Sequence, residues 1–510
     1  MILILDFCSQ YTQLIARCIR EEKVYCEVYT ANINLKLFQK LKQVKGIILS
    51  GGFSSVYSTN AIVPDPTLWA LNVPILGICY GMQLIASAYG GTVMQSKIRE
   101  FGLATVHLEN KTCPLFKGLN DNEVLWMSHT DHIVKVPKNF HIIAQSENTN
   151  CAGISHTVKN IYGVQFHPEV KHSINGKKII QNFIFQICHS NNSWNVKSYL
   201  CDEMVHIKNQ IGSNKVVCAL SGGVDSAVVS ILVKKTIGKQ LICIYIDHGL
   251  QRYGETERVR KIFKPIFGSN LLIINAKKMF LSKLKGVVNP EIKRKIIGNA
   301  FIKIFLDTTK KCKDVKFLLQ GTIYSDIIES YYIKGLKKPI KSHHNVGGLP
   351  NKMKFKIIEP LKLLFKDEVR ILGKNLGLPN EILQRQPFPG PGFAIRIIGD
   401  ITEAKIKIVR KADAIVTEEI TRSGLYNKIW QAFALLLSTK TVGVMGDVRT
   451  YDYTIVIRAV KSDDAMTADW VKLPYELLGK ISSRIINEVK GINRVVYDIS
   501  NKPPATIEWE

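Results

Sequence analysis

Short apolar runs alternate with helical patterns along most of this chain, and the alternation limits the folds that are open to it. Near the start the runs are GIILSGG, VPILGIC and IYGVQFHP, and later ones are VVCAL, LICIYID, LLIINA and KFLLQG. Buried strands separated by helices build parallel sheets, so we predict two parallel-sheet α/β units. After RQPFPGPGFAIR the pattern changes to a helical stretch followed by longer strands, which predicts a smaller α+β unit.

A chain of 510 residues is too long to be served by one hydrophobic core. The polar stretch HSNNSW separates the first group of apolar runs from the second and has the composition of a linker. We therefore predict three domains, at residues 1–190, 195–385 and 386–510.

Basic residues outnumber acidic ones, 69 to 42, which gives a formal net charge of +27. They are spread along the chain, so a solvated surface that steers small anions is favoured and nucleic-acid binding is not expected. No apolar run approaches the roughly 20 residues that cross a bilayer, so no membrane segment is expected. The 11 cysteines include no Cys-x-x-Cys pair. This argues against structural zinc and a disulfide framework, and it favours the cytoplasm.

The segment PILGICYGMQ has the pattern of a strand, a sharp turn and a helix. Around Cys79 the spacing is Gly-x-Cys-x-Gly, and such small neighbours let the backbone turn tightly and lift a nucleophile clear of the sheet. The helix N-terminus behind it favours the thiolate, which is the nucleophilic form. A single cysteine is more often a core residue, so this interpretation requires a base nearby.

The predicted base lies in YGVQFHPEV, where His167 ends a strand and Glu169 follows across a proline. A histidine that takes the thiol proton and a carboxylate that orients the histidine complete a Cys-His-acid triad. The glycine turn in LSGGFSSV includes Gly52. We expect amides of this turn, with the amide of Tyr80, to form an oxyanion hole.

Together, GICYGMQ and GVQFHPEV resemble the class I glutamine amidotransferase domains. The resemblance implies that Cys79 attacks the side-chain amide of glutamine, His167 shuttles protons, Glu169 orients His167, and ammonia is released. It also implies a set of residues that help to hold glutamine, namely Gln83, Ser128 and His129. Two loops depart from the usual pattern, because DFCSQ has Cys8 in place of glycine and GGFSS has Phe53 in place of proline.

The stretch KVVCALSGGVDSAVV predicts a buried strand, a glycine turn and a helix. Amides at such a turn converge on an anion at the helix N-terminus. The turn lacks the lysine of a kinase-type phosphate loop, so we expect ATP to be cleaved between its α- and β-phosphates. Asp225 is the candidate ligand of Mg²⁺ bound with ATP, directly or through water. The residues of the predicted ATP loop are Ser221, Gly222, Gly223, Val224, Asp225, Ser226 and Ala227.

This unit resembles the N-type ATP pyrophosphatases, which activate a substrate oxygen by adenylylation and release pyrophosphate. Asp247 ends the next strand, where an open α/β sheet places its ligand, so we include it in the ATP site. The resemblance makes Lys366 in LFKDEVR the candidate cation for the departing pyrophosphate. No tightly bound organic cofactor is expected.

Segments along the whole chain resemble the family of glutamine-hydrolysing GMP synthases, and they include LLQGTIYSDIIES, IKSHHNVGGLP, QPFPGPG, VGVMGD and KPPATIEWE. The resemblance implies that xanthosine 5′-monophosphate (XMP) is adenylylated at O2 and aminated to GMP. It also implies that the C-terminal domain forms a homodimer. Four positions match residues that hold XMP in the family: Arg294, Asp447, Lys502 and Glu508.

An ATP pyrophosphatase that acts on tRNA bases is the alternative interpretation, because related enzymes modify RNA and this chain is basic. That interpretation leaves the glutaminase half unexplained and would favour a zinc knuckle or a Cys-x-x-Cys sulfur carrier, which the sequence lacks. The expected partners are therefore glutamine, ATP, XMP and a second copy of the chain.

Overall fold

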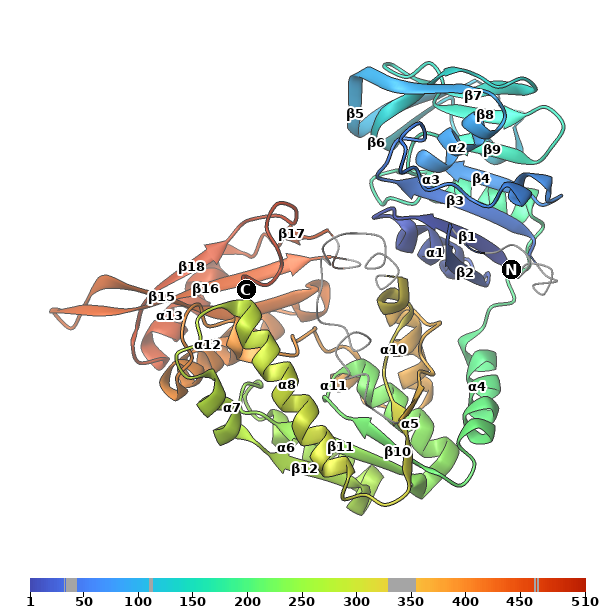
Figure 1. Cartoon of the computed structure of the whole chain (residues 1–510). Helices are drawn as coiled ribbons and strands as arrows, with labels where there is room; N and C mark the ends of the chain where they lie inside the picture. Colours follow the sequence, from blue (N-terminus) through green and yellow to red (C-terminus); the bar gives the residue numbers. More distant parts are fainter. Residues whose placement is uncertain (32, 34–43, 110–112, 329–354, 463–464, 466) are drawn as a thin grey trace. The chain divides into compact units, whose positions relative to one another are not determined.

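The computed structural model describes residues 1–31, 33, 44–109, 113–328, 355–462, 465 and 467–510 (Figure 1). The chain forms two compact units. The first contains Met1–Ser198 and Ser325–Ile340, and the second contains Tyr199–Tyr324 and Lys341–Glu510. Within the described ranges, no helix has the length and apolar character needed to cross a membrane.

The first unit is built on a sheet in which the described residues form nine strands, in the order β2-β1-β3-β4-β9-β8-β7-β5-β6. Strands β2, β1, β3, β4 and β9 pair in parallel, in agreement with the predicted α/β pattern, and all of them except the edge strand β2 are almost wholly buried. The strands are β1 (Ile2–Phe7), β2 (Cys26–Thr30), β3 (Gly46–Gly52), β4 (Ile75–Ile78), β5 (Thr92–Leu108), β6 (Asn122–Lys135), β7 (Phe140–Ser146), β8 (Gly153–His156) and β9 (Ile161–Val164).

The other half of this sheet differs from the prediction, because β8, β7, β5 and β6 pair antiparallel. The described links between these strands are loops and one 3-10 turn, η3 (Pro114–Phe116). Antiparallel neighbours need only such short links, whereas parallel neighbours need a long crossover. Burial alternates along β6, which is typical of a strand with one solvated face.

The helices of the first unit are α1 (Thr12–Glu21), α2 (Tyr80–Ala88) and α3 (Gly176–Gln181), with a π-helical turn η4 (Asn182–Ile187) and a 3-10 turn η2 (Pro66–Ala70). Helix α1 buries one stripe formed by Ile15, Ala16 and Ile19, as an amphipathic helix does. Helix α2 is buried from Tyr80 to Ala86 and packs against β3 and β4. Its N-terminus therefore lies at the carboxyl end of β4.

The second unit begins with a parallel sheet of order β12-β11-β10-β13-β14. These strands are β10 (Lys215–Ala219), β11 (Leu241–Asp247), β12 (Leu271–Asn275), β13 (Val315–Leu319) and β14 (Lys356–Ile358). The helices are α4 (Val196–Ile211), α5 (Val224–Ile237), α6 (Glu255–Phe267), α7 (Lys277–Leu284), α8 (Pro290–Thr309), α10 (Lys366–Asn375) and α11 (Asn380–Leu383), with 3-10 turns η5 (Gly238–Gln240) and η6 (Gly268–Asn270). The switch from β10 to α5 forms the glycine turn, as predicted.

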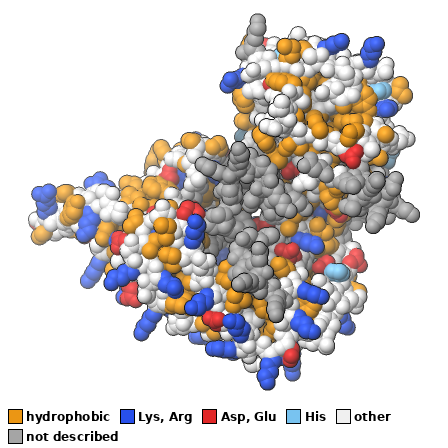
Figure 2. Space-filling view, viewed as in Figure 1, with side chains coloured by type: hydrophobic (Ala, Val, Ile, Leu, Met, Phe, Trp, Pro, Cys, Tyr) orange, Lys and Arg blue, Asp and Glu red, His pale blue; other side chains and the backbone are white. Residues whose placement is uncertain are grey.

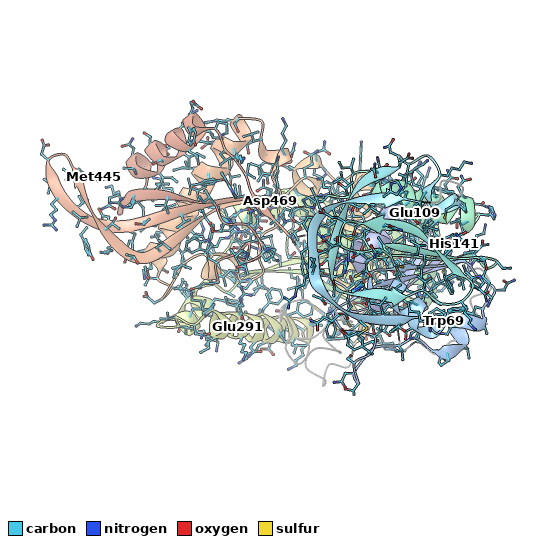
Figure 3. All side chains as sticks on the ribbon, turned by 90° about the horizontal axis from the view of Figure 1, so that it is seen from above. Trp69, Glu109, His141, Glu291, Met445 and Asp469 are labelled. Atoms are coloured by element: carbon cyan, nitrogen blue, oxygen red, sulfur yellow. The ribbon has the colours of Figure 1, made fainter. Side chains whose placement is uncertain are left out.

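The C-terminal part of the second unit is α+β. Its elements are η7 (Gly392–Ile395), α12 (Glu403–Arg422), η8 (Tyr426–Lys428), β15 (Gln431–Met445), β16 (Val448–Lys461), β17 (Asp469–Trp470), α13 (Tyr475–Glu488) and β18 (Ile492–Asp498). Strands β15 and β16 pair antiparallel over nearly their whole length, and β18 runs parallel to β16. The far ends of β15 and β16 project as a two-stranded ribbon whose tip carries Met445 (Figures 1 and 3).

One apolar cluster extends through both parts of the second unit. Val217 and Ile244 contribute from the parallel sheet, and Val409, Ile455 and Ile481 contribute from the C-terminal elements. The predicted second and third domains therefore share a core. The proposed boundaries at 190/195 and 385/386 remain predictions.

Candidate functional site

Cys79 lies at the turn between β4 and α2, with φ 53° and ψ −107°, and its side chain is buried. The small neighbours are required by contact. A Cβ on Gly77 would lie 2.5 Å from the carbonyl oxygen of Gly81, and a Cβ on Gly81 would lie 2.4 Å from the carbonyl oxygen of Leu49. The elbow is thus a strained backbone conformation that two glycines make possible. It sets the cysteine at the N-terminus of α2.

His167 and Glu169 follow β9 and form a buried pair, in which Nδ1 of His167 lies 2.8 Å from Oε1 of Glu169. The backbone amide of His167 donates to the carbonyl of Trp126 on β6, which fixes the position of the imidazole. Burial alone would lower the pKa of His167, but the charges of Glu169 and of the Cys79 thiolate raise it well above its usual value. The pair therefore favours a proton on the imidazole when the thiol loses one.

The predicted oxyanion residues lie together. A Cβ on Gly52 would lie 2.9 Å from the ring of Tyr80, and a Cβ on Gly51 would lie 3.1 Å from Cε1 of His167. The backbone of this turn thus passes directly beside His167 and Tyr80. Phe53, the residue in place of proline, is 63% exposed and leaves that packing undisturbed.

Cys8, the cysteine in place of glycine, has a strained backbone conformation. Cys8 has φ 65°, in the left-handed region that glycine adopts most readily. Its backbone amide donates to Oδ1 of Asp6 at 3.0 Å, and Asp6 also accepts the hydroxyl of Thr12 at 2.6 Å. These bonds hold the loop in shape despite the side chain.

The residues predicted to hold glutamine lie on α2 and β6. The carbonyl of Ser128 is 3.7 Å from Sγ of Cys79, within reach of the thiol proton. Gln83 is buried, and its Nε2 donates to the carbonyl of Asp131 at 3.0 Å. Ser128 therefore lies beside the cysteine, and Gln83 is fixed to β6 by its hydrogen bond to Asp131. Their contact with glutamine remains a prediction.

His129, the third of these residues, is buried and its Nε2 lies 3.0 Å from Glu100 on β5. Ser146 and Thr149 donate to the same carboxylate at 2.8 and 2.7 Å. Burial alone would raise the pKa of Glu100, but the hydrogen bonds from His129, Thr149 and Ser146 lower it to about 2. Glu100 was not identified from the sequence, because only the register of β5 against β6 sets it opposite His129.

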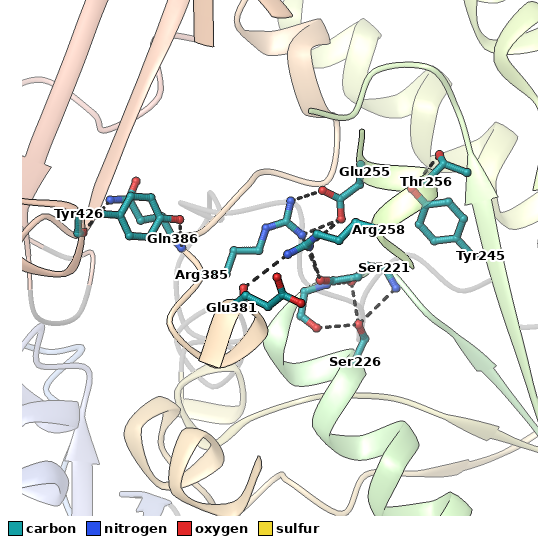
Figure 4. Close-up of polar contacts among 12 residues, drawn as sticks. Ser221, Ser226, Tyr245, Glu255, Thr256, Arg258, Glu381, Arg385, Gln386 and Tyr426 are labelled. Carbon is teal, nitrogen blue, oxygen red and sulfur yellow. Dashed lines mark hydrogen bonds and ion pairs between the residues drawn. The ribbon is translucent and has the colours of Figure 1, made fainter. Parts of the chain in front are cut away.

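The predicted ATP loop is closed by its own hydroxyl groups (Figure 4). The hydroxyl oxygens of Ser221 and Ser226 lie 2.9 Å apart, and Ser226 donates to the carbonyl of Gly223 at 3.1 Å. Gly222 has φ 79°, which lets the chain reverse in the turn. Ser221 is exposed, while Val224 and Ala227 are buried on α5 and anchor the turn to the core.

Two predicted ligands of ATP and pyrophosphate pair with each other. Lys366, at the start of α10, donates to Oδ2 of Asp225. Among the described residues, the buried Oδ1 of Asp225 has no hydrogen-bond partner. A carboxylate oxygen with a free lone pair suits a hard cation such as Mg²⁺, so Asp225 fits the role predicted for it. That role remains a proposal.

Asp247, at the end of β11, is more fully engaged than Asp225. It accepts the backbone amide of Gly249 at 3.1 Å and the hydroxyl of Thr256 at 2.7 Å, and Lys277 lies 3.1 Å from Oδ2. Its contacts order the loop that follows β11. A contact with ATP remains a prediction.

Three charged residues around the ATP loop were not identified from the sequence (Figure 4). Arg385 donates to the carbonyl of Gly222 at 3.1 Å and forms a bidentate pair with Glu255 on α6. Arg258 donates to Glu255 at 2.9 Å. Burial alone would raise the pKa of Glu255, but the pairing with Arg385 and Arg258 lowers it. Arg385 and Glu255 are 130 positions apart in the sequence, so no local pattern could have joined these two residues.

The residue after Arg385 faces a different element. Gln386 donates from Nε2 to the carbonyls of Tyr426 and Ile429 at 3.1 and 3.2 Å, and its Oε1 accepts the amide of Ala432 at 2.9 Å. Ala432 belongs to β15. The 385–386 pair therefore joins the ATP loop to the C-terminal sheet.

The structure brings two members of the predicted XMP set to the C-terminal tail. Arg294 on α8 donates to the backbone carbonyl of Glu510. Glu508, two residues earlier, accepts from Arg396 at 2.8 Å and from Gln431 at 2.7 Å. The tail is thus docked on the fold, and Arg294 contacts the segment that carries Glu508.

The other two members are placed differently. Lys502 donates from Nζ to the carbonyl of Ala465 at 2.7 Å. Asp447 lies in the turn that joins β15 to β16, next to the ribbon tip at Met445, far from Asp469 and from the start of α8 (Figure 3). The structure therefore does not bring Asp447 to Arg294. The segment IKSHHNVGGLP lies outside the described residues.

Family models match most of the chain in three parts. A model described as glutamine amidotransferase class-I matches residues 3–187, and one described as NAD synthase matches residues 196–296. One described as GMP synthase C terminal domain matches residues 418–509. Fold, elbow and ATP loop thus define a glutamine amidotransferase joined to an ATP pyrophosphatase-like unit.

Curated relatives match from end to end. A GMP synthase (glutamine-hydrolyzing) from Carboxydothermus hydrogenoformans is 55% identical over 511 residues, covering 100% of this chain and 99% of the relative. Proteins of the same name from Clostridium botulinum and Caldanaerobacter subterraneus are each 53% identical, with the same coverage. The chain belongs to the family of glutamine-hydrolysing GMP synthases. The predicted resemblance is confirmed.

Proposed function

We propose that this chain makes GMP from XMP, using ATP to activate XMP and glutamine as the source of nitrogen. The observation that carries the proposal is the identity of 53–55% to GMP synthases along the whole chain. It is supported by a cysteine elbow with a His-Glu pair in the first unit and a lysine-free glycine loop in the second. The same match leaves the tRNA-base alternative without support.

In the proposed glutaminase reaction, Cys79 passes its proton to His167 and the sulfur attacks the amide carbon of glutamine. The amides near Gly52 and Tyr80 hold the oxyanion. The C–N bond then breaks, and His167 returns the proton to the departing ammonia. Water, deprotonated by His167, hydrolyses the thioester to glutamate and restores the thiol. Glu169 keeps the imidazole oriented throughout.

In the proposed synthetase reaction, O2 of XMP attacks the α-phosphorus of ATP and pyrophosphate leaves. Ammonia then displaces AMP from C2 to give GMP. The loop from Ser221 to Ala227 would bind phosphate through backbone amides, and Lys366 would turn from Asp225 to the pyrophosphate. Mg²⁺ bound with ATP would neutralise phosphate charge, with Asp225 as its protein ligand. Arg294, Lys502 and Glu508 are the proposed XMP contacts within one chain.

We also propose that the chain is a homodimer that assembles through the β15–β16 ribbon. Val444 and Tyr451 on the ribbon are 73% and 63% exposed. Val442 is opposite Tyr451 in the register, and Val444 is two residues on, so the three share one face. A cluster of exposed apolar residues of this kind is expected to be covered. Sedimentation of Val444→Lys beside the parent protein tests this, and an unchanged mass would argue against it.

Two observations support the proposals that the protein acts on small molecules and works in the cytoplasm. All 11 cysteines lie in the described ranges and are free thiols, which suits a reducing compartment. On the face drawn in Figure 2, lysine and arginine side chains are scattered between neutral and acidic ones. A scattered distribution favours general attraction of anions over one nucleic-acid track.

Product analysis tests the proposed function directly. Purified protein is incubated with Mg-ATP, glutamine and XMP, and AMP, ADP and GMP are resolved, with a control that lacks XMP. We expect AMP and GMP to form together. AMP without GMP would mean a different acceptor, and tRNA would be tested next. ADP, or no cleavage, would contradict the assignment of the ATP loop.

A further inference from the structure

Gln165 is a fully buried residue between β9 and His167 whose side chain reaches the nucleophile. Its Nε2 lies 3.5 Å from Sγ of Cys79. Its backbone amide donates to the carbonyl of Ala152 at 2.9 Å, and the neighbouring carbonyl of Val164 accepts the amide of Cys79 at 2.7 Å. Both residues are thus fixed to the same part of the sheet. The contact is built into the fold rather than left to a mobile side chain.

The orientation of the Gln165 amide follows from a chain of hydrogen bonds that starts at a backbone carbonyl. The carbonyl of Asp131 can only accept, so the group of Gln83 that lies 3.0 Å from it must be the NH₂. The same NH₂ lies 3.2 Å from Gln165, so Gln165 must present its oxygen there. Its own NH₂ therefore faces Cys79. An amide turned the other way would set donor against donor.

The hydrogen-bond partner that suits the Cys79 sulfur changes during the proposed reaction, because the thiol is a donor and the thiolate is an acceptor. As a thiol, Cys79 can donate its proton toward the carbonyl of Ser128, 3.7 Å away. Once that proton has moved to His167, the sulfur is an anion and a carbonyl is a poor neighbour for it. A buried N–H that points at the sulfur is then favourable, because hydrogen bonds to charged groups are stronger than neutral ones.

We propose that Gln165 is a catalytic residue of the glutaminase half, which donates its side-chain N–H to the ionised sulfur of Cys79. Gln83 and the carbonyl of Asp131 are positioning groups that hold the Gln165 amide in this orientation. The inference rests on the proposed glutaminase function. It also gives Gln83 a task besides the predicted one of holding glutamine, since its NH₂ is already shared between two acceptors.

The test compares Gln165→Met, which keeps the length and removes the donor, with Gln165→Glu, which puts an acceptor in its place. The control is Asn182→Leu. Asn182 is another buried amide of the first unit, and it donates at 2.9 Å to the backbone carbonyls of Leu115 and Lys117. It contributes to packing without touching the cysteine.

The first measurement is the rate of Cys79 alkylation by iodoacetamide against pH, followed in the full chain by mass spectrometry of the Cys79 peptide. We expect the midpoint to move up by roughly one pH unit in Gln165→Met and further in Gln165→Glu. Asn182→Leu should leave the midpoint in place. His167 and Glu169, the titratable groups that face the sulfur, are present in every variant.

The second measurement is steady-state kinetics. We expect kcat for glutamine hydrolysis to fall about 10- to 100-fold in Gln165→Met, with a smaller change in KM for glutamine. GMP formation from free ammonia should stay within about twofold of the parent value, which also shows that the variant is folded. An unchanged alkylation midpoint with a kcat loss below about twofold would overturn the inference.

Two outcomes are kept apart by this design. If the parent protein does not hydrolyse glutamine, the proposed function fails, but the alkylation profile still tests the N–H donor. If both Gln165 variants are insoluble, Gln83→Met releases the Gln165 amide without replacing it. A midpoint shift in the same direction would then support the inference. A rise in KM for glutamine with no midpoint shift would overturn it, because Gln83 would then act on the substrate alone.

Discussion

The glutaminase site and the ATP loop are built in opposite ways. In the first, Cys79, His167 and Glu169 are all buried; backbone hydrogen bonds hold Cys79 and His167 to the sheet, and Glu169 pairs with His167. In the second, Ser221 is exposed and the charged groups pair with one another, Lys366 with Asp225 and Arg385 with Glu255.

The difference follows from the substrates that we propose. Glutamine offers a neutral amide to the nucleophile, so the protein must supply the charges of the reaction itself, in a site that excludes water. ATP brings several negative charges and a cation, and a site that receives them must hold opposite charges that can exchange partners. Pairs such as Lys366 with Asp225 keep the ATP loop neutral until then.

The largest effect is expected from Cys79→Ala. GMP formation from glutamine should fall by about 1,000-fold or more, because no other group supplies the nucleophile. GMP formation from free ammonia should persist. Cys151→Ala is the matched control, since Cys151 is a buried core thiol of the same unit. Loss of the ammonia reaction in a well-folded Cys79→Ala protein would mean that the two sites are not separate.

Asp225→Asn should lower ATP cleavage by about 100-fold or more with either nitrogen source, because the free carboxylate oxygen is lost. The measurement is AMP formation with glutamine and with ammonia. Asp307→Asn is the control, because Asp307 also pairs with a lysine, Lys310, but on the surface. Equal effects of both substitutions on AMP formation would contradict the role proposed for Asp225.

Glu100→Gln should destabilise the first unit by about 2–3 kcal/mol at pH 7. The folded pKa of about 2 is lower than the usual value near 4.5. The carboxylate therefore stabilises the fold above pH 4.5, and this contribution is lost as the pH falls toward 2. Hydrogen exchange in β5 and β6 measures the effect, with Glu109→Gln as the exposed control (Figure 3). A difference that persisted at pH 2 would contradict the assignment.

Arg385→Gln should raise KM for ATP by about 10-fold, since it loosens the Gly222 turn and leaves Glu255 with one partner fewer. Arg260→Gln is the control. Arg260 forms a comparable but exposed pair with Glu257 on α6, the helix that also carries Glu255. ATP titrations with free ammonia avoid any contribution from the glutaminase. The same KM in both variants would show that the ATP loop does not depend on Arg385.

The smallest effect is expected from Cys8→Gly. Relief of the positive φ should stabilise the first unit by about 0.5–1 kcal/mol after the entropy of glycine is taken into account. Cys18→Gly, in the middle of α1, should instead destabilise it by a similar amount. Thermal inactivation of the glutaminase compares the two. A loss of stability in Cys8→Gly would mean that the Cys8 side chain makes up for its strained backbone.

Local patterns predicted the parts of the molecule that local contacts build. The Gly77–Gly81 contact spans four residues, so the spacing alone predicted the elbow, and the same holds for the turn from β10 to α5. The sequence predicted that Cys79, His167 and Glu169 act together, but it did not predict individual hydrogen bonds between residues far apart in the chain. Gln165 and Cys79 are 86 residues apart, and Lys366 and Asp225 are 141 apart.

The antiparallel half of the first sheet was missed for a related reason. An apolar run has the same composition in either strand direction, and the lengths of the links between strands decide which direction is formed. The register of β5 against β6, which follows from those links, then decides that Glu100 meets His129.

The adjacent residues Arg385 and Gln386 have a mechanical consequence. One side chain holds the carbonyl of Gly222, and the next holds the amide of Ala432 at the start of β15. Two adjacent residues therefore connect the proposed phosphate-binding loop to β15, the strand that continues into the ribbon. We expect a displacement of Gly222 on nucleotide binding to move the start of β15 as well, and a fluorine probe at Trp430 would detect it.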